Sequence, residues 1–428
     1  MPAGIDTGDT AFMLVCTALV LLMTPALGLF YAGLVRSKNT LNTFMMCVAA
    51  LAVATITWAL IGYSLAFDGD GKILGGLGHA LLDGVAFEPR DGTTIPHLVF
   101  FAFQATFCII TTALVSGAVV ERMRFLPFVI FAALWSVLVY AVLAHWAFGG
   151  GWLQAQGTLD FAGGVPVEMG SGFSALAAAL VVGARKDYGR QALLPHNAMY
   201  VLVGAGLLWF GWFGFNGGSG FSTGNASVLA FVNTLLTPAC TLAVWFLLDL
   251  VRGRQITAIG AATAIIVGCV AITPAGGFIS PAWAMVLGAL AAVPCWLVIQ
   301  WRPRTRVDET LDVLAAHGIA GFTGILFIGL AANIDWNGVS DGLFYGDAAQ
   351  LGEQALAALV APVYAFVMTF ALLKLINVFS PLRGTAREEA IGMDIVHHGE
   401  EAYITGEGAI LVSTEAKEDE RRPVAQLV

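Results

Sequence analysis

Two ionisable side chains in this 428-residue chain stand at matching places in two similar apolar segments. Glu168 is followed at +4 to +6 by Gly-Phe-Ser (172–174), and His317 is followed at the same offsets by Gly-Phe-Thr (321–323). A carboxylate at membrane depth is costly and is therefore usually functional. A lone histidine is more often a core residue. An acid and an imidazole brought together by symmetry can relay a proton, and we interpret the two as a pair.

The elements that must position this pair are membrane helices. Hydrophobic residues make up 58% of the chain and charged residues 11%, whereas a soluble domain has about 25% charged residues. Apolar runs of about 20 residues recur throughout, and in lipid such runs must be helical. The pattern predicts an all-α membrane protein with eleven transmembrane helices, near residues 11–35, 41–66, 98–120, 125–148, 162–184, 195–215, 226–251, 257–275, 281–300, 311–332 and 355–378. The eighth of these runs is short, and Pro274 interrupts it.

Basic residues in the predicted loops indicate the orientation. Alternate loops carry them in clusters, and the intervening loops carry only Lys72 and Arg90 together with several acids. The clustered residues are Arg36, Lys38, Arg122, Arg124, Arg185, Lys186, Arg190, Arg252, Arg254, Arg302, Arg304 and Arg306. Positively charged loops stay inside. We therefore expect an outer N-terminus and a cytoplasmic tail, with residues 1–380 forming the transmembrane domain and residues 381–428 the tail.

The matching segments belong to the fifth and tenth predicted helices. Two units of five helices must run in opposite directions, because five is odd, and this is the inverted-repeat arrangement of many transporters. In such a repeat Glu168 and His317 meet only if both lie near the middle of the membrane.

Other kinds of site are not indicated. The six cysteines all fall in apolar runs without C-x-x-C spacing, which is typical of small core residues. The chain has no phosphate-binding loop, no nucleophile elbow and no H-E-x-x-H motif. We expect neither an enzyme, nor a bound cofactor or metal, nor a nucleic-acid partner.

Ordered motifs across residues 10–405 resemble the ammonium transporter family (Amt/Mep, related to the Rh proteins). They include Met23-Thr24-Pro25, Phe30–Asn39, Phe103–Phe107, Gly117–Arg122, Asp160–Gly164, Gly211–Asn216, Ala271–Gly277, His317-Gly318 and Glu388–Asp394. The resemblance implies eleven helices, an inverted five-plus-five repeat, a homotrimer in the cell membrane and one pore in each subunit.

The same resemblance implies an outer recruiting site and a gate. Phe103, Phe107, Phe148 and Ser219 correspond to the recruiting site, where ring faces and a hydroxyl hold ammonium. Phe107 and Phe215 correspond to the stacked gate below it. Phe148 departs from the usual Trp, which implies either weaker capture of the cation or compensation by a neighbour such as Phe103. Without the motifs, these phenylalanines would be packing residues and Ser219 a turn residue.

Glu168 and His317 align with the twin histidines of the family pore, in a variant with an acid at the first position that resembles one group of fungal transporters. Asp160 resembles the buried structural aspartate of the family, and an ordinary helix-capping role is the alternative. Trp212 is expected to line the pore. The pair is expected to titrate as one unit.

The resemblance implies that ammonium, or its analogue methylammonium, is recruited outside and deprotonated, that ammonia crosses an apolar pore, and that the proton passes over Glu168 and His317, so uptake is electrogenic. A neutral ammonia channel and an ammonium sensor acting through a cytoplasmic partner are the alternatives. In bacterial members, a segment like Ser380–Tyr403 binds a regulator of the PII type. Residues 413–428 are expected to be disordered.

Overall fold

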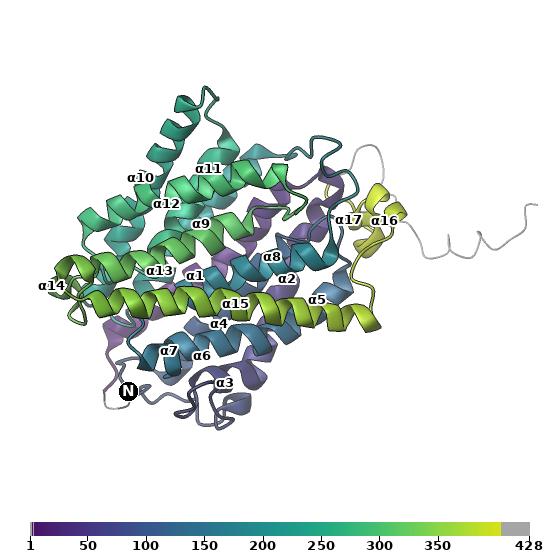
Figure 1. Ribbon diagram of the computed structural model, residues 1–428. Helices are drawn as coiled ribbons and strands as arrows, with labels where there is room; N and C mark the ends of the chain where they lie inside the picture. The colour runs from purple at the N-terminus through teal and green to yellow at the C-terminus, as the bar shows by residue number, and fades with distance from the viewer. Residues whose placement is uncertain (1, 3, 404–428) are drawn as a thin grey trace, which may run out of the picture.

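A computed structural model describes Pro2 and residues 4–403 as a bundle of long helices without a strand among these residues. The helices run roughly along one direction in Figure 1. The N-terminus and α14 (Ile334–Asn337) lie near one end of the bundle, here called the N-terminal end. The short helices α16 (Ala386–Ile391) and α17 (Met393–His398) lie at the other end, here called the tail end.

The remaining helices follow chain order, with η marking 3-10 and π-type segments. They are α1 (Thr7–Leu34), η1 (Ser37–Asn39), α2 (Thr40–Thr57), η2 (Trp58–Gly62), α3 (Tyr63–Phe67), η3 (Ala80–Leu82), α4 (His97–Ser116), α5 (Phe125–Trp135), η4 (Ser136–Tyr140), α6 (Ala141–Phe148), α7 (Trp152–Ala155), η5 (Gly164–Met169), α8 (Gly170–Val182), α9 (Ala198–Gly218), α10 (Asn225–Val251), α11 (Ala258–Ile272), α12 (Pro281–Trp301), η6 (Arg302–Arg304), η7 (Leu314–Ile319), α13 (Ala320–Ala331), η8 (Leu343–Tyr345) and α15 (Ala348–Phe379).

Ten helical stretches of the described residues are long and apolar enough to cross a membrane, which confirms a multi-pass, all-helical protein. The predicted eighth helix is α11, which has only 15 residues because Thr273 and Pro274 follow its end. It is apolar but shorter than the other ten. Eleven spans therefore stay a prediction that rests on α11.

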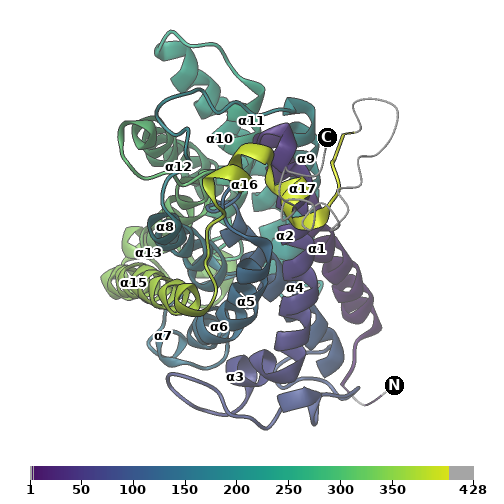
Figure 2. The same cartoon turned by 90° about the vertical axis from the view of Figure 1, so that its right-hand side faces the viewer.

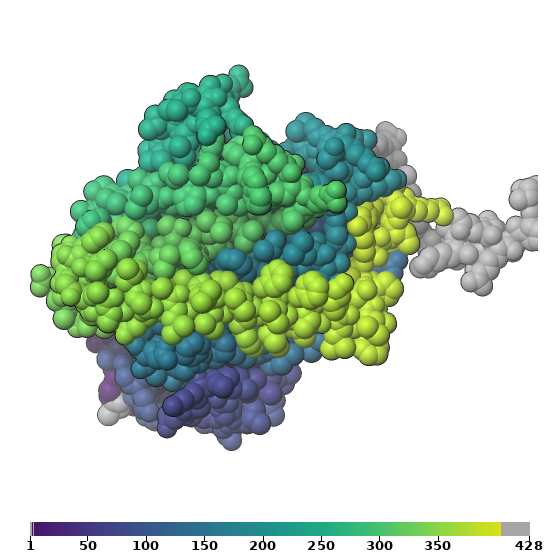
Figure 3. All heavy atoms as spheres, viewed as in Figure 1, coloured from purple at the N-terminus to yellow at the C-terminus, as the bar shows by residue number. Residues whose placement is uncertain are grey.

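The outer surface of the bundle is apolar along the helices. On α15, the side chains of Leu359, Val363, Val367 and Leu375 are exposed at helical spacing along one stripe. Figure 3 shows this face, along which α15 runs for much of the length of the molecule. Exposed apolar stripes on long helices match a lipid surrounding, in which backbone groups are satisfied within each helix.

The tail end carries the predicted basic loops. Figure 2 faces this end and shows α16 and α17 lying across it, with α17 packed against α2. Asp394 accepts hydrogen bonds from the backbone N–H groups of Leu41 and Asn42 at 3.0 and 2.8 Å. The Lys38 ammonium donates to the carbonyls of Glu389 and Ala390. The tail and the basic loops thus share one end, and its placement in the cytoplasm stays a prediction from the charge rule.

Helices from the two predicted units interlock at the centre. Segment η5 leads into α8, and η7 leads into α13. In the folded chain α8 packs against η7, and α13 packs against η5. The two matching sequence segments therefore lie against each other, although the inverted relation of whole units stays a prediction.

Candidate functional site: three cavities in series

Three cavities follow one another from the N-terminal end to the tail end. The cavity at the N-terminal end, here called the outer cavity after the predicted orientation, has a volume of about 730 Å³, and the cavity at the tail end has a volume of about 180 Å³. Between them lies a small chamber of about 20 Å³, which has room for roughly one water-sized molecule. Phe107 borders the outer cavity and Phe215 borders the chamber, while His317 borders both the chamber and the tail-end cavity. The arrangement is a narrow path with a vestibule at each end.

Glu168 and His317 meet in the wall of the chamber. The His317 Nδ1 lies 2.8 Å from the Glu168 Oε2, and both side chains are buried, with 5% and 0% of their surface exposed. The second carboxylate oxygen of Glu168 has no hydrogen-bond partner among the described residues. The structure therefore brings together the two residues that the repeated motif paired. With a free acceptor on Glu168 and with His317 bordering two cavities, the arrangement is one through which a proton could be relayed.

Local helix geometry turns both side chains toward the path. Both stand in π-type segments, Glu168 in η5 and His317 in η7. A π-type turn inserts an extra residue into a helix, which rotates the side chains that follow, and such turns are frequent at functional sites. Each π-type turn directly precedes the helix that carries the matching Gly-Phe-Ser/Thr sequence. Glu168 and His317 are therefore positioned by the same kind of local backbone geometry.

The chamber is otherwise apolar. Its wall is formed by Met23, Leu27, Phe30, Ile110, Leu114, Val167, Leu208, Trp212, Phe215 and Ile266, together with Glu168 and His317. Trp212 is thus one of the residues that line the chamber. Its indole N–H donates to the Thr273 hydroxyl at 2.9 Å, so the polar atom of the ring is already satisfied. An ion in this chamber would find few groups to replace its water, whereas a small neutral molecule needs none.

A pair of stacked rings closes the chamber on the outer side. The rings of Phe107 on α4 and Phe215 on α9 lie 4.0 Å apart with planes inclined by 23°. Each side chain is 1% exposed. Stacked rings at this distance leave no room for water between them. Passage from the outer cavity into the chamber requires one or both rings to move.

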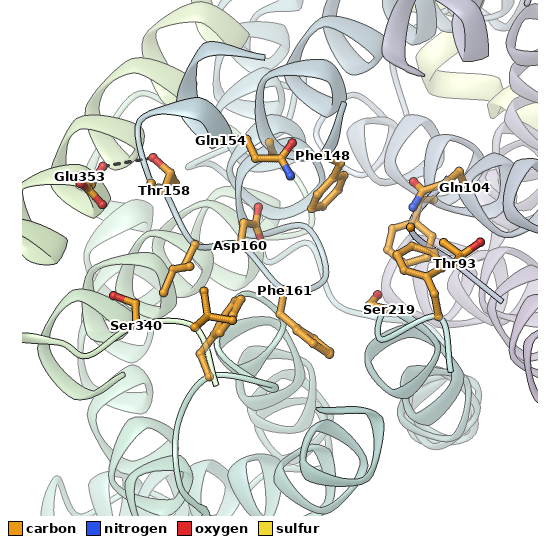
Figure 4. A pocket seen from close by; sticks show the side chains of 18 of the residues that line it. Thr93, Gln104, Phe148, Gln154, Thr158, Asp160, Phe161, Ser219, Ser340 and Glu353 are labelled. Carbon is orange, nitrogen blue, oxygen red and sulfur yellow. Dashed lines mark hydrogen bonds between the residues drawn. The ribbon is translucent and has the colours of Figure 1, made fainter. Parts of the chain in front are cut away.

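Phe148 and Ser219 line the outer cavity together with Phe107, and Figure 4 shows the first two at its wall. The Ser219 hydroxyl donates to the Phe215 carbonyl at 2.8 Å. Its hydrogen is thereby used, and its oxygen lone pairs remain to accept an N–H group. Phe103 is placed differently from the other predicted members. It is fully buried and packs against Phe107 at 4.8 Å rather than lining the cavity.

Asp160 also borders the outer cavity, and its carboxylate holds the start of η5. One oxygen accepts the N–H groups of Gly163 and Gly164 at 2.9 and 2.8 Å, and the other accepts that of Val165 at 2.7 Å. Burial raises the pKa of Asp160 to about 6, while the three backbone hydrogen bonds lower it. The side chain thus anchors the segment that carries Glu168.

A buried ion network at the tail end was not foreseen as a unit. Glu121 receives Arg36 Nε at 2.9 Å on one oxygen and Arg185 Nη1 at 2.7 Å on the other. Arg185 also forms a two-point bond with Asp308, at 2.8 Å for each contact. Arg185 lines the tail-end cavity. Glu121 lies in the Gly117–Arg122 motif, but its partners come from distant loops, and no spacing in the sequence connects them.

Two further residues of the outer cavity were missed, Phe221 and Gln104. Phe221 has a positive φ of 53° and packs against Phe100 at 4.9 Å. Gln104 lies within the Phe103–Phe107 motif, but the motif predicts no role for it. Neither position has a spacing that distinguishes it from ordinary helix or loop residues.

The chain is similar to known proteins in both sequence and overall fold. A sequence model described as Ammonium Transporter Family matches residues 11–403. An ammonium transporter of Bacillus subtilis is 45% identical over 399 residues, which cover 92% of this chain and 98% of that protein. The crystal structure of Saccharomyces cerevisiae Mep2 has a TM-score of 0.85 at 31% identity and covers 90% of this chain and 89% of its own. A solved Sensor Amt Protein has the same TM-score at 26% identity, covering 91% and 98%.

Proposed function

Because the chain belongs to the ammonium transporter family, we propose that this multi-pass membrane protein carries ammonium in an electrogenic way, as separated ammonia and proton. Ammonium transport itself follows from the family. The proposal concerns the route: capture in the outer cavity, loss of a proton, passage of ammonia through the chamber, and transfer of the proton over Glu168 and His317.

The observation that carries the proposal is the polarity of the path. An ammonium ion taken into apolar surroundings loses tens of kcal/mol of hydration by Born estimates. The chamber holds about 20 Å³ and offers only two titratable side chains, so it cannot replace that hydration. Ammonia carries no charge and fits such a chamber. The proton must then travel separately if charge is to cross.

Capture begins in the outer cavity. The ring faces of Phe107 and Phe148 and the lone pairs of Ser219 suit a small cation that donates N–H bonds. Phe148 attracts a cation less strongly than the Trp that is usual in the family. Phe103 supports the site from behind through its contact with Phe107. Asp160 adds negative charge at the cavity floor and fixes the backbone below it.

The proton has a continuous pair of carriers. Glu168 and His317 are in direct contact, and His317 also reaches the tail-end cavity. A carboxylic acid next to a neutral imidazole and a carboxylate next to an imidazolium differ only by one proton shift across 2.8 Å. Charge crosses when Glu168 takes up a proton, passes it to His317, and His317 releases the proton of its other ring nitrogen toward the tail-end cavity, so that no ammonium ion has to enter the chamber.

A neutral ammonia channel and an ammonium sensor are the two alternative functions. A neutral ammonia channel would use the same gate and chamber but would have no need for a titrating pair. A sensor is favoured by the similarity to the Sensor Amt Protein. The docked tail offers a binding surface for a cytoplasmic partner. We propose that this partner is a regulator of the PII type and that the protein assembles as a homotrimer. Residues 404–428, including the stretch expected to be disordered, lie outside the described residues.

The test is a current measurement on purified protein in proteoliposomes. Pulses of ammonium or methylammonium should evoke inward positive current, and radiolabelled methylammonium uptake should accumulate with it. Liposomes without protein, given the same pulses, control for ammonia that crosses lipid. Uptake that moves no charge at any pH would refute the electrogenic route and favour a neutral channel. Binding of ligand without uptake would favour the sensor.

A further inference from the structure

One side chain of the outer cavity has a buried amide oxygen that no group among the described residues hydrogen-bonds. Gln104 on α4 lines the cavity, yet only 3% of its surface is exposed. Its amide oxygen is buried and accepts no hydrogen bond within the described part of the chain. Figure 4 shows its amide end directed into the cavity, across from Phe148 and near Ser219 and Thr93.

An unpartnered amide in such a place is unusual. Buried polar groups are nearly always hydrogen-bonded, because an unmade bond costs free energy that water no longer supplies. Gln104 stands one helical turn before Phe107, and side chains three positions apart share one face of a helix. The idle acceptor therefore lies beside the outer ring of the gate.

We propose that the Gln104 amide oxygen is a substrate-binding acceptor that binds one N–H group of ammonium in the outer cavity. The proposal rests on the recruiting site placed there above. Ammonium donates hydrogen bonds in four directions and accepts none, whereas alkali cations donate none. The amide oxygen is buried as it stands, and a half-turn of the terminal amide, which exchanges its oxygen and nitrogen in place, turns the acceptor toward the cavity.

The outer cavity offers a captured cation few hydrogen-bond acceptors other than Gln104. Ser219 offers lone pairs of one hydroxyl, and the three N–H groups on Asp160 already occupy its carboxylate. Phe148 contributes a ring without the stronger pull of an indole. Gln104 adds a neutral acceptor to this cavity, which provides a captured ammonium ion with one further hydrogen bond.

The experiment compares half-saturation and maximal rate for methylammonium uptake, together with ammonium-evoked current, in proteoliposomes. Gln104→Leu removes the acceptor at similar volume, and we expect a roughly 3- to 10-fold rise in half-saturation with the maximal rate within about twofold. Gln104→Glu keeps an acceptor of equal length and should hold half-saturation at or below that of the unmodified protein.

Gln154→Leu is the matched control. Gln154 lines the same cavity, but its amide oxygen already accepts the Gly150 N–H at 2.8 Å, so half-saturation should stay unchanged. An unchanged half-saturation in Gln104→Leu, or a shift equal to that of the control, overturns the inference. If Gln104→Leu fails to assemble, Gln104→Met, which is unbranched like Gln, takes its place under the same criteria. Uptake without current would refute the electrogenic route, while the half-saturation comparison would still decide the role of Gln104.

Discussion

Gly172 on α8 and Gly321 on α13 occupy reciprocal positions at the crossing of the two pore helices. A Cβ at Gly172 would collide with the backbone of Gly318, and a Cβ at Gly321 would come within 2.5 Å of the Glu168 Cβ. Gly172 thus lets its helix approach Gly318, the neighbour of His317, and Gly321 lets its helix approach Glu168 itself. The contact between Glu168 and His317 depends on this close approach of two backbones.

We expect Gly172→Ala to disrupt transport through this crossing. Forcing a methyl group against backbone costs about 1–3 kcal/mol and pushes the helices apart, which lengthens the bond between Glu168 and His317. Uptake and thermal stability of the purified protein should both fall. Gly206→Ala, on α9 with nothing within 4 Å of its new Cβ, should leave both at or above their original values. Equal behaviour of the two variants would contradict the role given to the crossing.

Glu168 is expected to act through its titration rather than its volume. Glu168→Gln keeps shape and hydrogen bonding but cannot release a proton, so the ammonium-evoked current should disappear. Glu168→His should retain current with a shifted pH optimum, because the ordinary pKa values of the two groups differ by about 2 units. His317→Ala should be at least as damaging as Glu168→Gln. Current and methylammonium flux are measured side by side, with assembly checked by size. Wild-type current in Glu168→Gln would make Glu168 a pore-shaping residue.

Much of this site was predictable because its residues carry local patterns. The repeated Gly-Phe-Ser/Thr match paired Glu168 with His317, and they lie in contact. Apolar run length located the membrane helices to within a few residues. Charged partners were not predictable, because Arg36, Glu121 and Arg185 come from three separate loops. Nor could the sequence show that Phe103 packs behind Phe107, since an aromatic on a buried helix has the same pattern in either place.

Asp160→Ala should abolish transport and lower the yield of folded protein. It leaves three backbone N–H groups at the start of η5 without an acceptor, a loss of about 3 kcal/mol or more for bonds to a charged group. Asp160→Glu should keep partial function. Asp91→Ala, in the same cavity, is the control and should transport normally. Normal uptake by folded Asp160→Ala would remove Asp160 from the site.

Phe148→Trp should tighten apparent ammonium affinity. A gain of about 0.5–1 kcal/mol in cation–π attraction corresponds to a roughly two- to fivefold lower half-saturation. Phe148→Leu should move half-saturation in the opposite direction, because it removes the ring. Concentration series of ammonium-evoked current measure both. If the Trp and Leu variants shift half-saturation in the same direction, ring attraction is not the cause.

The Glu121 network should make stability depend on pH at the acid end. Burial raises the pKa of Glu121, but Arg185 and Arg36 outweigh it and hold the pKa at about 2, below the ordinary 4.5. The resulting stabilisation, about 3 kcal/mol, is fully present above pH 4.5 and is lost as pH falls toward 2. Glu121→Gln should therefore lower the melting temperature most at pH 7 and less at pH 3. Glu88→Gln, at an exposed loop position, should show no such difference. A Glu121→Gln deficit that is constant across pH would mean that packing, rather than charge, holds the network.

The small volume of the central chamber has a consequence for the cell that carries this protein. A space for about one water molecule cannot hold an unbroken file of water, and such a file would let protons run down their gradient unaided. With the Phe107 and Phe215 rings closed, an idle transporter should leave the membrane as tight as bare lipid. A cell short of nitrogen can then place many copies in its membrane without draining its proton-motive force.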